Sequence, residues 1–218
     1  MKPDVPDGQA SCGRSREPLS AVSRRGFLKG AGATVAGVGL LGPTAIAQEK
    51  PEAGGVPTLA AEPMQLKLRV NGVEREVRAM PSSTLLDTIR GELDLTGAKR
   101  ICDRGSCGGC TMSVGGRVVN SCSFLAVDAI GQDVVTIEGL ANGDKLTDVQ
   151  QAFVDYDALQ CGFCTPGMIV ACTALLEQNP APTRAEVAEG IAGNLCRCGT
   201  YPNVFRAVEA VVRKRKGG

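Results

Sequence analysis

The cysteine content of the chain, together with the absence of histidine, limits its fold and chemistry more than any other feature. The chain has ten cysteines and no histidine, and nine of the cysteines lie between residues 102 and 198. Without histidine there is no Ser-His-Asp triad, no Cys-His nucleophile, no mixed cysteine–histidine zinc site, no Rieske centre and no His-ligated haem. The chemistry of the chain is therefore cysteine chemistry.

The first group of cysteines lies in the sequence CDRGSCGGCT and is completed by a fourth cysteine farther along the chain. Its x4, x2 spacing with a distant fourth cysteine is the plant-type [2Fe–2S] arrangement, in which a loop wraps around the cluster. Glycines in the loop permit the tight curvature and let backbone N–H groups approach the sulfurs. The four predicted ligands of this first quartet are Cys102, Cys107, Cys110 and Cys122.

The second group consists of a C-x2-C pair and a C-x-C pair in the segments QCGFCTPGM and NLCRCGTYP. Each pair comes just before a predicted helix, one beginning near Pro166 and the other near Pro202. Helix N-termini stabilise thiolates and anionic clusters, so the pattern predicts a second cluster held between helices. The predicted ligands of this second quartet are Cys161, Cys164, Cys196 and Cys198.

Three other interpretations of the cysteines stay open at this point: four disulfides, a four-thiolate zinc site in each quartet, and a thioredoxin-like or haem motif. The closely spaced Cys196 and Cys198 fit poorly to separate bridges, and the first quartet lacks zinc-ribbon spacing. Thr111 and Thr165 stand where haem attachment requires histidine. The remaining Cys172 lies in an apolar predicted helix and is predicted to be a buried packing residue.

The first 47 residues have the features of an export signal. The segment SRRGFLK at residues 23–29 is similar to the twin-arginine signal, an uncharged stretch follows, and Ala45-Ile46-Ala47 is a signal-peptidase site. We predict cleavage after Ala47 and a periplasmic protein exported folded by the twin-arginine machinery. An uncleaved anchor is the alternative, because about 18 apolar residues can span a bilayer. Five glycines and Pro43 make that segment a weak span, so no stable membrane span is expected after cleavage.

The rest of the chain divides by composition and periodicity. Residues 48–63 form a Pro-, Gly- and Ala-rich linker, residues 64–140 have strand and hairpin patterns, and residues 141–218 have helical periodicity. We predict strands at 65–70, 74–78, 111–114, 118–119 and 134–137, and a helix capped by Ser82 or Ser83. Further helices are predicted at 144–156, 166–178, 183–192 and 202–215, the last ending in a solvated basic tail. The fold class is therefore α+β.

The charge balance excludes one class of partner. The chain has 24 Lys and Arg against 23 Asp and Glu, and it has no Trp. A nucleic-acid partner is not expected, because proteins that bind nucleic acid usually carry a strong basic excess and stacking aromatics.

The motifs CDRGSCGGCT, QCGFCTPGM and NLCRCGTYPN resemble those of the small iron–sulfur subunit of molybdenum hydroxylases, the xanthine oxidase and aldehyde oxidoreductase group. The resemblance covers residues 64–215. It implies an N-terminal β-grasp 2Fe–2S ferredoxin-like domain (64–140) followed by an all-α four-helix [2Fe–2S]-binding domain (141–218). The segment CRCGTYPN departs from the CRCTGYxP of many relatives, which leaves the ligands in place but changes the local turn.

The resemblance also implies cofactors and partners. The second quartet would hold the [2Fe–2S] cluster nearest a molybdenum–pterin cofactor in a large molybdopterin-binding subunit. The first would hold the [2Fe–2S] cluster nearer the FAD of a medium subunit. Gln160 matches the family glutamine that hydrogen-bonds the pterin.

The resulting hypothesis is an electron-transfer subunit of a periplasmic aldehyde oxidoreductase complex, with no substrate site of its own. The alternatives are the same role in a relative acting on N-heterocycles or carbon monoxide, and a free-standing two-cluster carrier.

Overall fold

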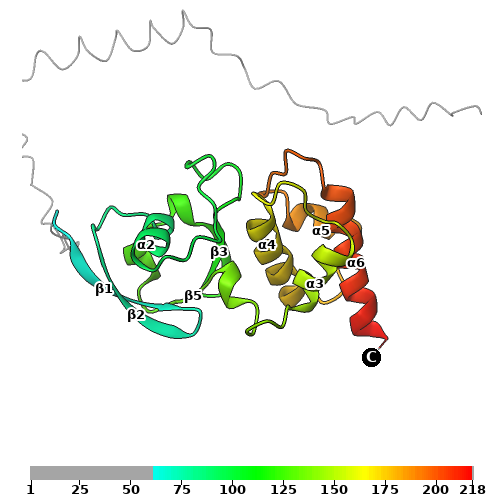
Figure 1. Ribbon diagram of the computed structural model, residues 1–218, viewed down its shortest axis with the longest axis horizontal. Helices are drawn as coiled ribbons and strands as arrows, with labels where there is room; N and C mark the ends of the chain where they lie inside the picture. Colours follow the sequence, from blue (N-terminus) through cyan, green and yellow to red (C-terminus); the bar gives the residue numbers. More distant parts are fainter. Residues whose placement is uncertain (1–60, 218) are drawn as a thin grey trace, which may run out of the picture. The chain divides into compact units, whose positions relative to one another are not determined.

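The computed structural model describes residues 61–217 (Figure 1). The predicted export signal (1–47) and the predicted linker up to residue 60 lie outside the described residues. Within residues 61–217, no helix is long and apolar enough to cross a membrane.

The N-terminal half of the described chain forms a mixed five-stranded sheet in the order β2-β1-β5-β3-β4. Strands β1 and β5 are parallel, and the other neighbouring strands are antiparallel. The strands are β1 (Met64–Val70), β2 (Val73–Ala79), β3 (Thr111–Val114), β4 (Arg117–Asn120) and β5 (Asp133–Val135). Strand β5 ends before the predicted 137 because the N–H of Thr136 donates to the side chain of Asn71 at 2.9 Å.

Asn71-Gly72, between the strands predicted at 65–70 and 74–78, is the strongest short hairpin signal and predicts a tight turn, which the structure confirms. Both residues have positive φ, 52° and 78°, as a two-residue turn with the twist of a β-ribbon requires. The alternation in β1 places Leu66, Leu68 and Val70 in the core.

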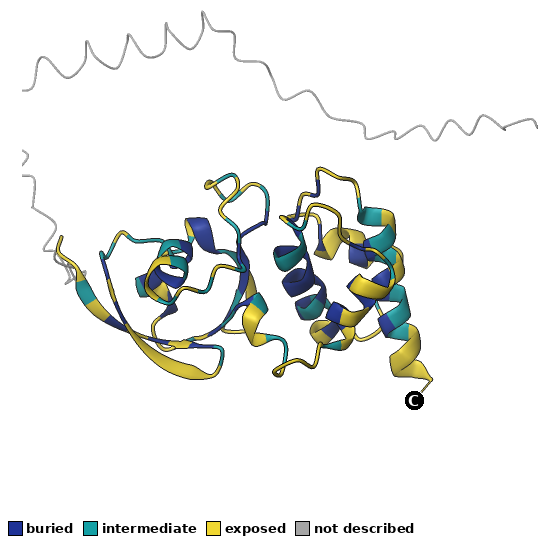
Figure 2. Cartoon of the chain, viewed as in Figure 1, coloured by how far each residue is buried: buried dark blue, intermediate teal, exposed yellow. Residues whose placement is uncertain are grey.

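Helix α2 (Leu85–Glu92) covers the sheet and closes the first hydrophobic core, which appears dark blue in Figure 2. The predicted caps Ser82 and Ser83 are wrong, since the cap is Thr84, whose hydroxyl accepts from the N–H of Asp87 at 3.1 Å. Ser83 instead accepts from the N–H of Met80. Short 3-10 turns follow the sheet's later strands: η2 (Ser121–Ser123), η3 (Ala126–Ala129) and η4 (Ile137–Gly139).

Four helices form the second half of the described chain and a second hydrophobic core. They are α3 (Asp148–Asp155), α4 (Thr165–Gln178), α5 (Arg184–Gly190) and α6 (Tyr201–Lys216). Helix α3 begins later than the predicted 144 because Thr147 and Gln150 form a capping box there. Thr183 with Glu186 three residues later predicts a capping box, and the structure confirms it at the start of α5. The sheet and helices together confirm the α+β class.

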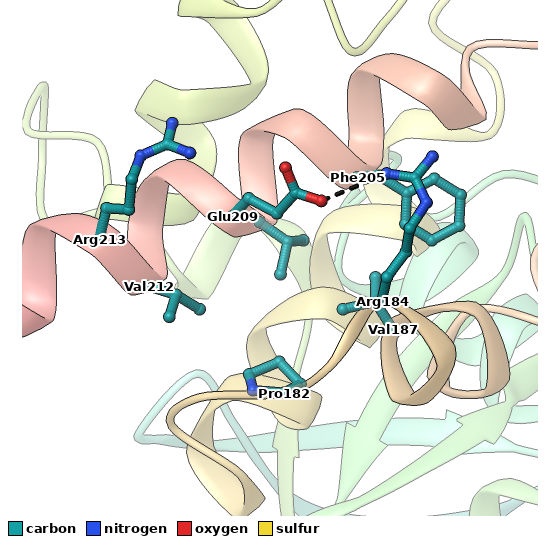
Figure 3. A pocket seen from close by; sticks show the side chains of 8 residues that line it. Pro182, Arg184, Val187, Phe205, Glu209, Val212 and Arg213 are labelled. Carbon is teal, nitrogen blue, oxygen red and sulfur yellow. Dashed lines mark hydrogen bonds and ion pairs between the residues drawn. The ribbon is translucent and has the colours of Figure 1, made fainter.

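Helices α5 and α6 are joined by one arginine. The guanidinium of Arg184 lies 4.3 Å from the centre of the Phe205 ring and 3.2 Å from a carboxylate oxygen of Glu209. Figure 3 shows these three side chains at the edge of a cavity of about 250 Å³. No cysteine lines this cavity, so it is separate from the candidate metal sites.

The basic end of α6 is exposed, as predicted, but it also makes defined contacts. Lys214 Nζ lies 2.7 Å from Asp148 Oδ1 in α3. The Arg215 guanidinium donates to the carbonyl of Leu176 in the last turn of α4 at 3.0 Å. The tail therefore ties α6 to two neighbouring helices.

The Lys214–Asp148 pair predicts a pH-dependent contribution to stability. The hydrogen bond from the Lys214 ammonium lowers the pKa of Asp148. A lowered carboxyl pKa stabilises the fold above the unfolded pKa, and this contribution is lost as pH falls through the folded pKa. Because both side chains are largely exposed, Lys214→Met is expected to cost about 0.2–1 kcal/mol at neutral pH.

Urea unfolding at pH 7 and pH 3 measures this effect. The difference between Lys214→Met and the wild type should shrink at the lower pH, whereas Lys216→Met, which removes a charge with no ion pair in the described chain, should show no such change. An undiminished difference at pH 3 would contradict the assignment.

Candidate metal centres

The first quartet gathers around the loop that connects α2 to β3. Cys102 and Cys107 are half-buried in this loop, whereas Cys110 and Cys122 are buried, with 2% and 7% exposure. Cys110 immediately precedes β3, and Cys122 lies in η2 after β4. The β3–β4 hairpin therefore brings the distant fourth cysteine back to the loop.

Backbone N–H groups of the loop point at two of these sulfurs. The N–H of Gly105 donates to Cys122 Sγ at 3.2 Å, and the N–H of Ser106 donates to Cys102 Sγ at 3.3 Å. The side-chain amide of Asn120 donates to the carbonyl of Gly105 at 2.9 Å and fixes the loop. Such donors stabilise the thiolate form, which is the form that binds metal.

Thiol pKa values in the first quartet diverge. The backbone N–H of Arg104, with the Cys107 side chain, lowers the pKa of Cys102 to about 7. Burial raises the pKa of Cys110 to about 11, and the neighbouring Cys122 thiol adds to this rise. A cluster that binds all four must therefore displace a proton from a buried thiol, which couples loading to pH.

The second quartet lies at the starts of α4 and α6. Cys164 is the residue that caps α4, and Pro166 occupies its first turn. Cys164 and Cys196 are each 9% exposed, whereas Cys161 and Cys198 are exposed. Cys196 precedes α6, whose first turn contains Pro202. The predicted relation between the cysteine pairs and the helix starts is therefore observed.

Thiol pKa values diverge here too. Burial raises the pKa of Cys164 to about 12, and the Cys196 thiol adds to the rise. Burial also acts to raise the pKa of Cys196, but hydrogen bonds from Thr200 outweigh burial and lower this pKa to about 7. The Thr200 hydroxyl lies 3.1 Å from Cys196 Sγ.

The nine cysteines of the described chain are all free thiols. Among residues 61–217, no three side chains of metal-binding type converge on a point where one ion could be held. Neighbouring thiols contribute to three of the shifted pKa values: the Cys107 side chain lowers that of Cys102, the Cys122 side chain raises that of Cys110, and Cys196 and Cys161 raise that of Cys164. Four cysteine thiolates are the protein ligands of a [2Fe–2S] cluster.

The divergent pKa values predict an order of thiol reactivity in the iron-free protein. At pH 7.5, Cys102 is expected to react with iodoacetamide before Cys110, because the thiolate is the nucleophile and, of these two thiols, Cys102 has the pKa near that pH. Timed alkylation followed by peptide mass spectrometry measures the order. Unfolding in urea should abolish the difference, and equal rates in the folded protein would contradict the prediction.

The two quartets meet through a short segment before Cys196. The N–H of Leu195 donates to the carbonyl of Cys107 at 2.9 Å. The buried amide of Asn194 donates to the carbonyl of Gly108 at 3.0 Å. Sequence reasoning did not find Asn194, because an asparagine in a loop usually indicates a turn; the available signal was its position two residues before a predicted ligand.

Gln160, the predicted pterin contact, is exposed beside the second quartet. It lines a pocket of about 320 Å³ together with Cys198, Pro202 and Asn203. The pocket places a side-chain amide next to an exposed predicted ligand, at the surface of the helical half.

The described residues match a family of known cofactor chemistry. Residues 136–209 match the model of the [2Fe–2S] binding domain. The match contains the second quartet, the helices α3, α4 and α5, and the first part of α6.

Characterised proteins and solved structures extend the match. The chain is 38% identical to the aldehyde oxidoreductase iron–sulfur-binding subunit PaoA of Escherichia coli (strain K12), over 87% of each chain. It is similar to quinoline 2-oxidoreductase from Pseudomonas putida 86, with 41% identity, a TM-score of 0.68 and coverage of 72% of this chain and 98% of that one. It is also similar to the aldehyde oxidoreductase of Desulfovibrio desulfuricans ATCC 27774, with 38% identity and a TM-score of 0.67, over 70% of this chain but only 17% of that longer chain.

Proposed function

We propose a function from one premise: the chain belongs to the family of small iron–sulfur subunits of molybdenum hydroxylases, and it is an electron-transfer subunit of an oxidoreductase. On this premise, we propose that the chain passes electrons one at a time from a molybdenum–pterin cofactor in a large subunit, through two [2Fe–2S] clusters, toward FAD in a medium subunit. The observation that carries the proposal is the backbone hydrogen bond from Leu195, the residue before Cys196 of the second quartet, to Cys107 of the first.

The proposed ligand sets follow the two halves of the described chain. We assign residues 64–140 to a β-grasp domain whose cluster is held by the first quartet, and residues 141–218 to a helical domain whose cluster is held by the second. The donor chemistry fits, because each set offers four free thiols, and N–H groups already point at two sulfurs of the first set. When bound, each cluster takes up and releases a single electron.

The chain's own residues perform three tasks in this proposal. Loop N–H groups would offset thiolate charge, Cys110 and Cys164 would hold each cluster from a buried position, and the exposed Cys161 and Cys198 would hold the second cluster at the surface where a partner can reach it. Electron passage in one direction needs only modest differences in potential, since about 59 mV changes a one-electron equilibrium tenfold. Hydrogen bonding and burial differ between the quartets and can supply such differences.

We propose that the surface around the second quartet binds the large partner subunit. Phe163 and Leu195 adjoin the predicted ligands Cys164 and Cys196 in the sequence and are 58% and 55% exposed, and we propose that the partner covers these apolar side chains. Gln160 is proposed to hydrogen-bond the pterin from this surface. The chain covers 87% of PaoA, whose name gives it as an iron–sulfur-binding subunit, and we propose on this likeness that the molybdenum and FAD sites are on separate subunits.

Aldehydes are the favoured substrate class. The part of the chain after the predicted export signal, residues 48–218, is less than four-fifths of its length. The match to PaoA covers 87% of the chain, so it must include part of the export signal. The likeness to the aldehyde oxidoreductase subunit therefore extends beyond the cysteine domains. The second candidate is an N-heterocycle, supported by the 41% identity to the quinoline enzyme.

The complex isolated from its native host tests this function. We expect two other subunits, molybdenum, and about four irons per small subunit, with anaerobic aldehyde bleaching the iron–sulfur absorbance. Bleaching by quinoline but not by aldehyde would support the second candidate. A monomer without molybdenum, with clusters that no substrate reduces, would overturn the proposal in favour of a free-standing carrier.

Periplasmic location is proposed from the leader and has its own test. Changing Arg24 and Arg25 to Lys is expected to retain the subunit in the cytoplasm, because the twin-arginine machinery recognises that pair. The matched control changes Arg14 and Arg16, two arginines earlier in the same leader, to Lys. Fractionation and immunoblotting measure the result, and normal export of the first variant would contradict the proposal.

A further inference from the structure

The side chain of Asn194 is buried between the two cysteine quartets. It is 4% exposed, and its amide nitrogen donates both to the carbonyl of Gly108 and to the hydroxyl of Thr111, each at 3.0 Å. Gly108 lies between the predicted ligands Cys107 and Cys110. The Thr111 hydroxyl in turn donates to the Gly108 carbonyl at 2.7 Å. Asn194 therefore completes a buried network on the loop that carries the first quartet.

The backbone of Asn194 is tied to the second quartet by Tyr201. The tyrosine hydroxyl donates to the carbonyl of Asn194 at 3.1 Å and accepts from the N–H of Cys196 at 2.8 Å. Between these bonds, the N–H of Leu195 donates to Cys107. Each of the three residues from Asn194 to Cys196 thus has a backbone group held by a hydrogen bond, to Tyr201 or to Cys107.

Close backbone packing leaves little room for the loop to move. A Cβ on Gly108 would collide with the backbone of Gly193 and Asn194, and a Cβ on Gly167 in α4 would collide with the carbonyl of Gly108. Gly167 is three residues after Cys164. The loop of the first quartet therefore rests on both ligand-bearing segments of the second.

A buried amide stabilises the fold only when its hydrogen bonds are made. This network therefore contributes most to stability when the Cys107–Cys110 loop and the segment leading to Cys196 hold one fixed arrangement. We propose that Asn194 is a positioning residue that sets the separation and orientation of the two clusters, and thereby the coupling that electron passage between them requires. The inference rests on the proposed function, since it needs a cluster in each quartet. Asn194 acts only through Gly108, Thr111 and the segment leading to Cys196.

Magnetic coupling between the two reduced clusters tests this role, because it depends on their separation and orientation and not on overall stability. The isolated complex is reduced anaerobically and studied by low-temperature EPR, with iron measured on the same samples. The wild-type complex is expected to show a splitting from this coupling, and Asn194→Ala is expected to retain both clusters and to lose or change that splitting. A wild-type complex that holds both clusters but shows no splitting would overturn the proposal.

Asn120→Ala is the matched control. It removes an asparagine amide that donates to the carbonyl of Gly105 in the same loop, but both ends of that bond belong to the first quartet's surroundings. It should leave the splitting unchanged. A wild-type splitting in Asn194→Ala with full iron would overturn the proposal, as would an equal change in Asn120→Ala.

Two further outcomes are distinguishable. If Asn194→Ala fails to load both clusters, Tyr201→Phe is used instead, since it removes only the hydroxyl that joins Asn194 to Cys196. A changed EPR splitting in Tyr201→Phe would support the positioning role of Asn194, and an unchanged splitting would overturn it. A wild-type complex with iron for one cluster only would overturn the proposed function itself, before any variant is compared.

Discussion

Cys164→Ala is expected to remove one whole cluster from the protein, about two of four irons per chain, and to stop electron passage to the other cluster. Cys164 caps α4, is 9% exposed and lies against the Cys196 thiol. The alanine leaves three thiolates for a cluster that needs four. Because metal binding is coupled to folding, the helical half should also lose stability.

Cys172→Ala is the matched control, since it makes the same substitution eight residues later in the same helix. Cys172 is fully buried, and burial alone raises its pKa to about 12, with no neighbouring thiol involved. This variant should keep four irons and both EPR signals. Iron analysis and EPR of the two variants give the comparison, and full iron in Cys164→Ala or a lost cluster in Cys172→Ala would refute the ligand assignment.

Features set by neighbours in the sequence could be predicted. The Asn71-Gly72 hairpin, the capping box of Thr183 and the buried position of Cys172 all follow from residues within a few positions of one another. Pro166 and Pro202, which suit the first turn of a helix, likewise predicted the helix starts that follow Cys164 and Cys198. The predicted cap of α2 was wrong by one residue or two. Thr84 is the cap, because the Ser83 hydroxyl accepts instead from the N–H of Met80.

Features that join distant segments could not be predicted in this way. The parallel pairing of β1 with β5 brings together residues more than sixty positions apart, and no periodicity specifies it. The hydrogen bond between Asn194 and Thr111 spans 83 positions, and the sequence around either residue does not indicate this contact. The junction of the quartets depends on such contacts, so the sequence predicted each ligand set but not how one set meets the other.

The same junction predicts that two glycine-to-alanine changes in helices have opposite effects on stability. Alanine normally favours a helix interior over glycine by roughly 0.5–1 kcal/mol. Gly91 in α2 has nothing within reach of an added Cβ, so Gly91→Ala should stabilise by about this amount. At Gly167 in α4, the added Cβ would strike the backbone carbonyl of Gly108, which three donors already hold in place.

Gly167→Ala should therefore destabilise the protein by about 1–3 kcal/mol, because a backbone atom cannot rotate away as a side chain would. For a chain of this size, each kcal/mol lowers the thermal midpoint by about 2–4 °C. Anaerobic calorimetry of both variants measures the signs, and EPR splitting in Gly167→Ala should change along with stability, since the clash pushes the Cys107–Cys110 loop away from α4. A Gly167→Ala variant as stable as Gly91→Ala would mean that the two cysteine-bearing segments do not pack against each other as described.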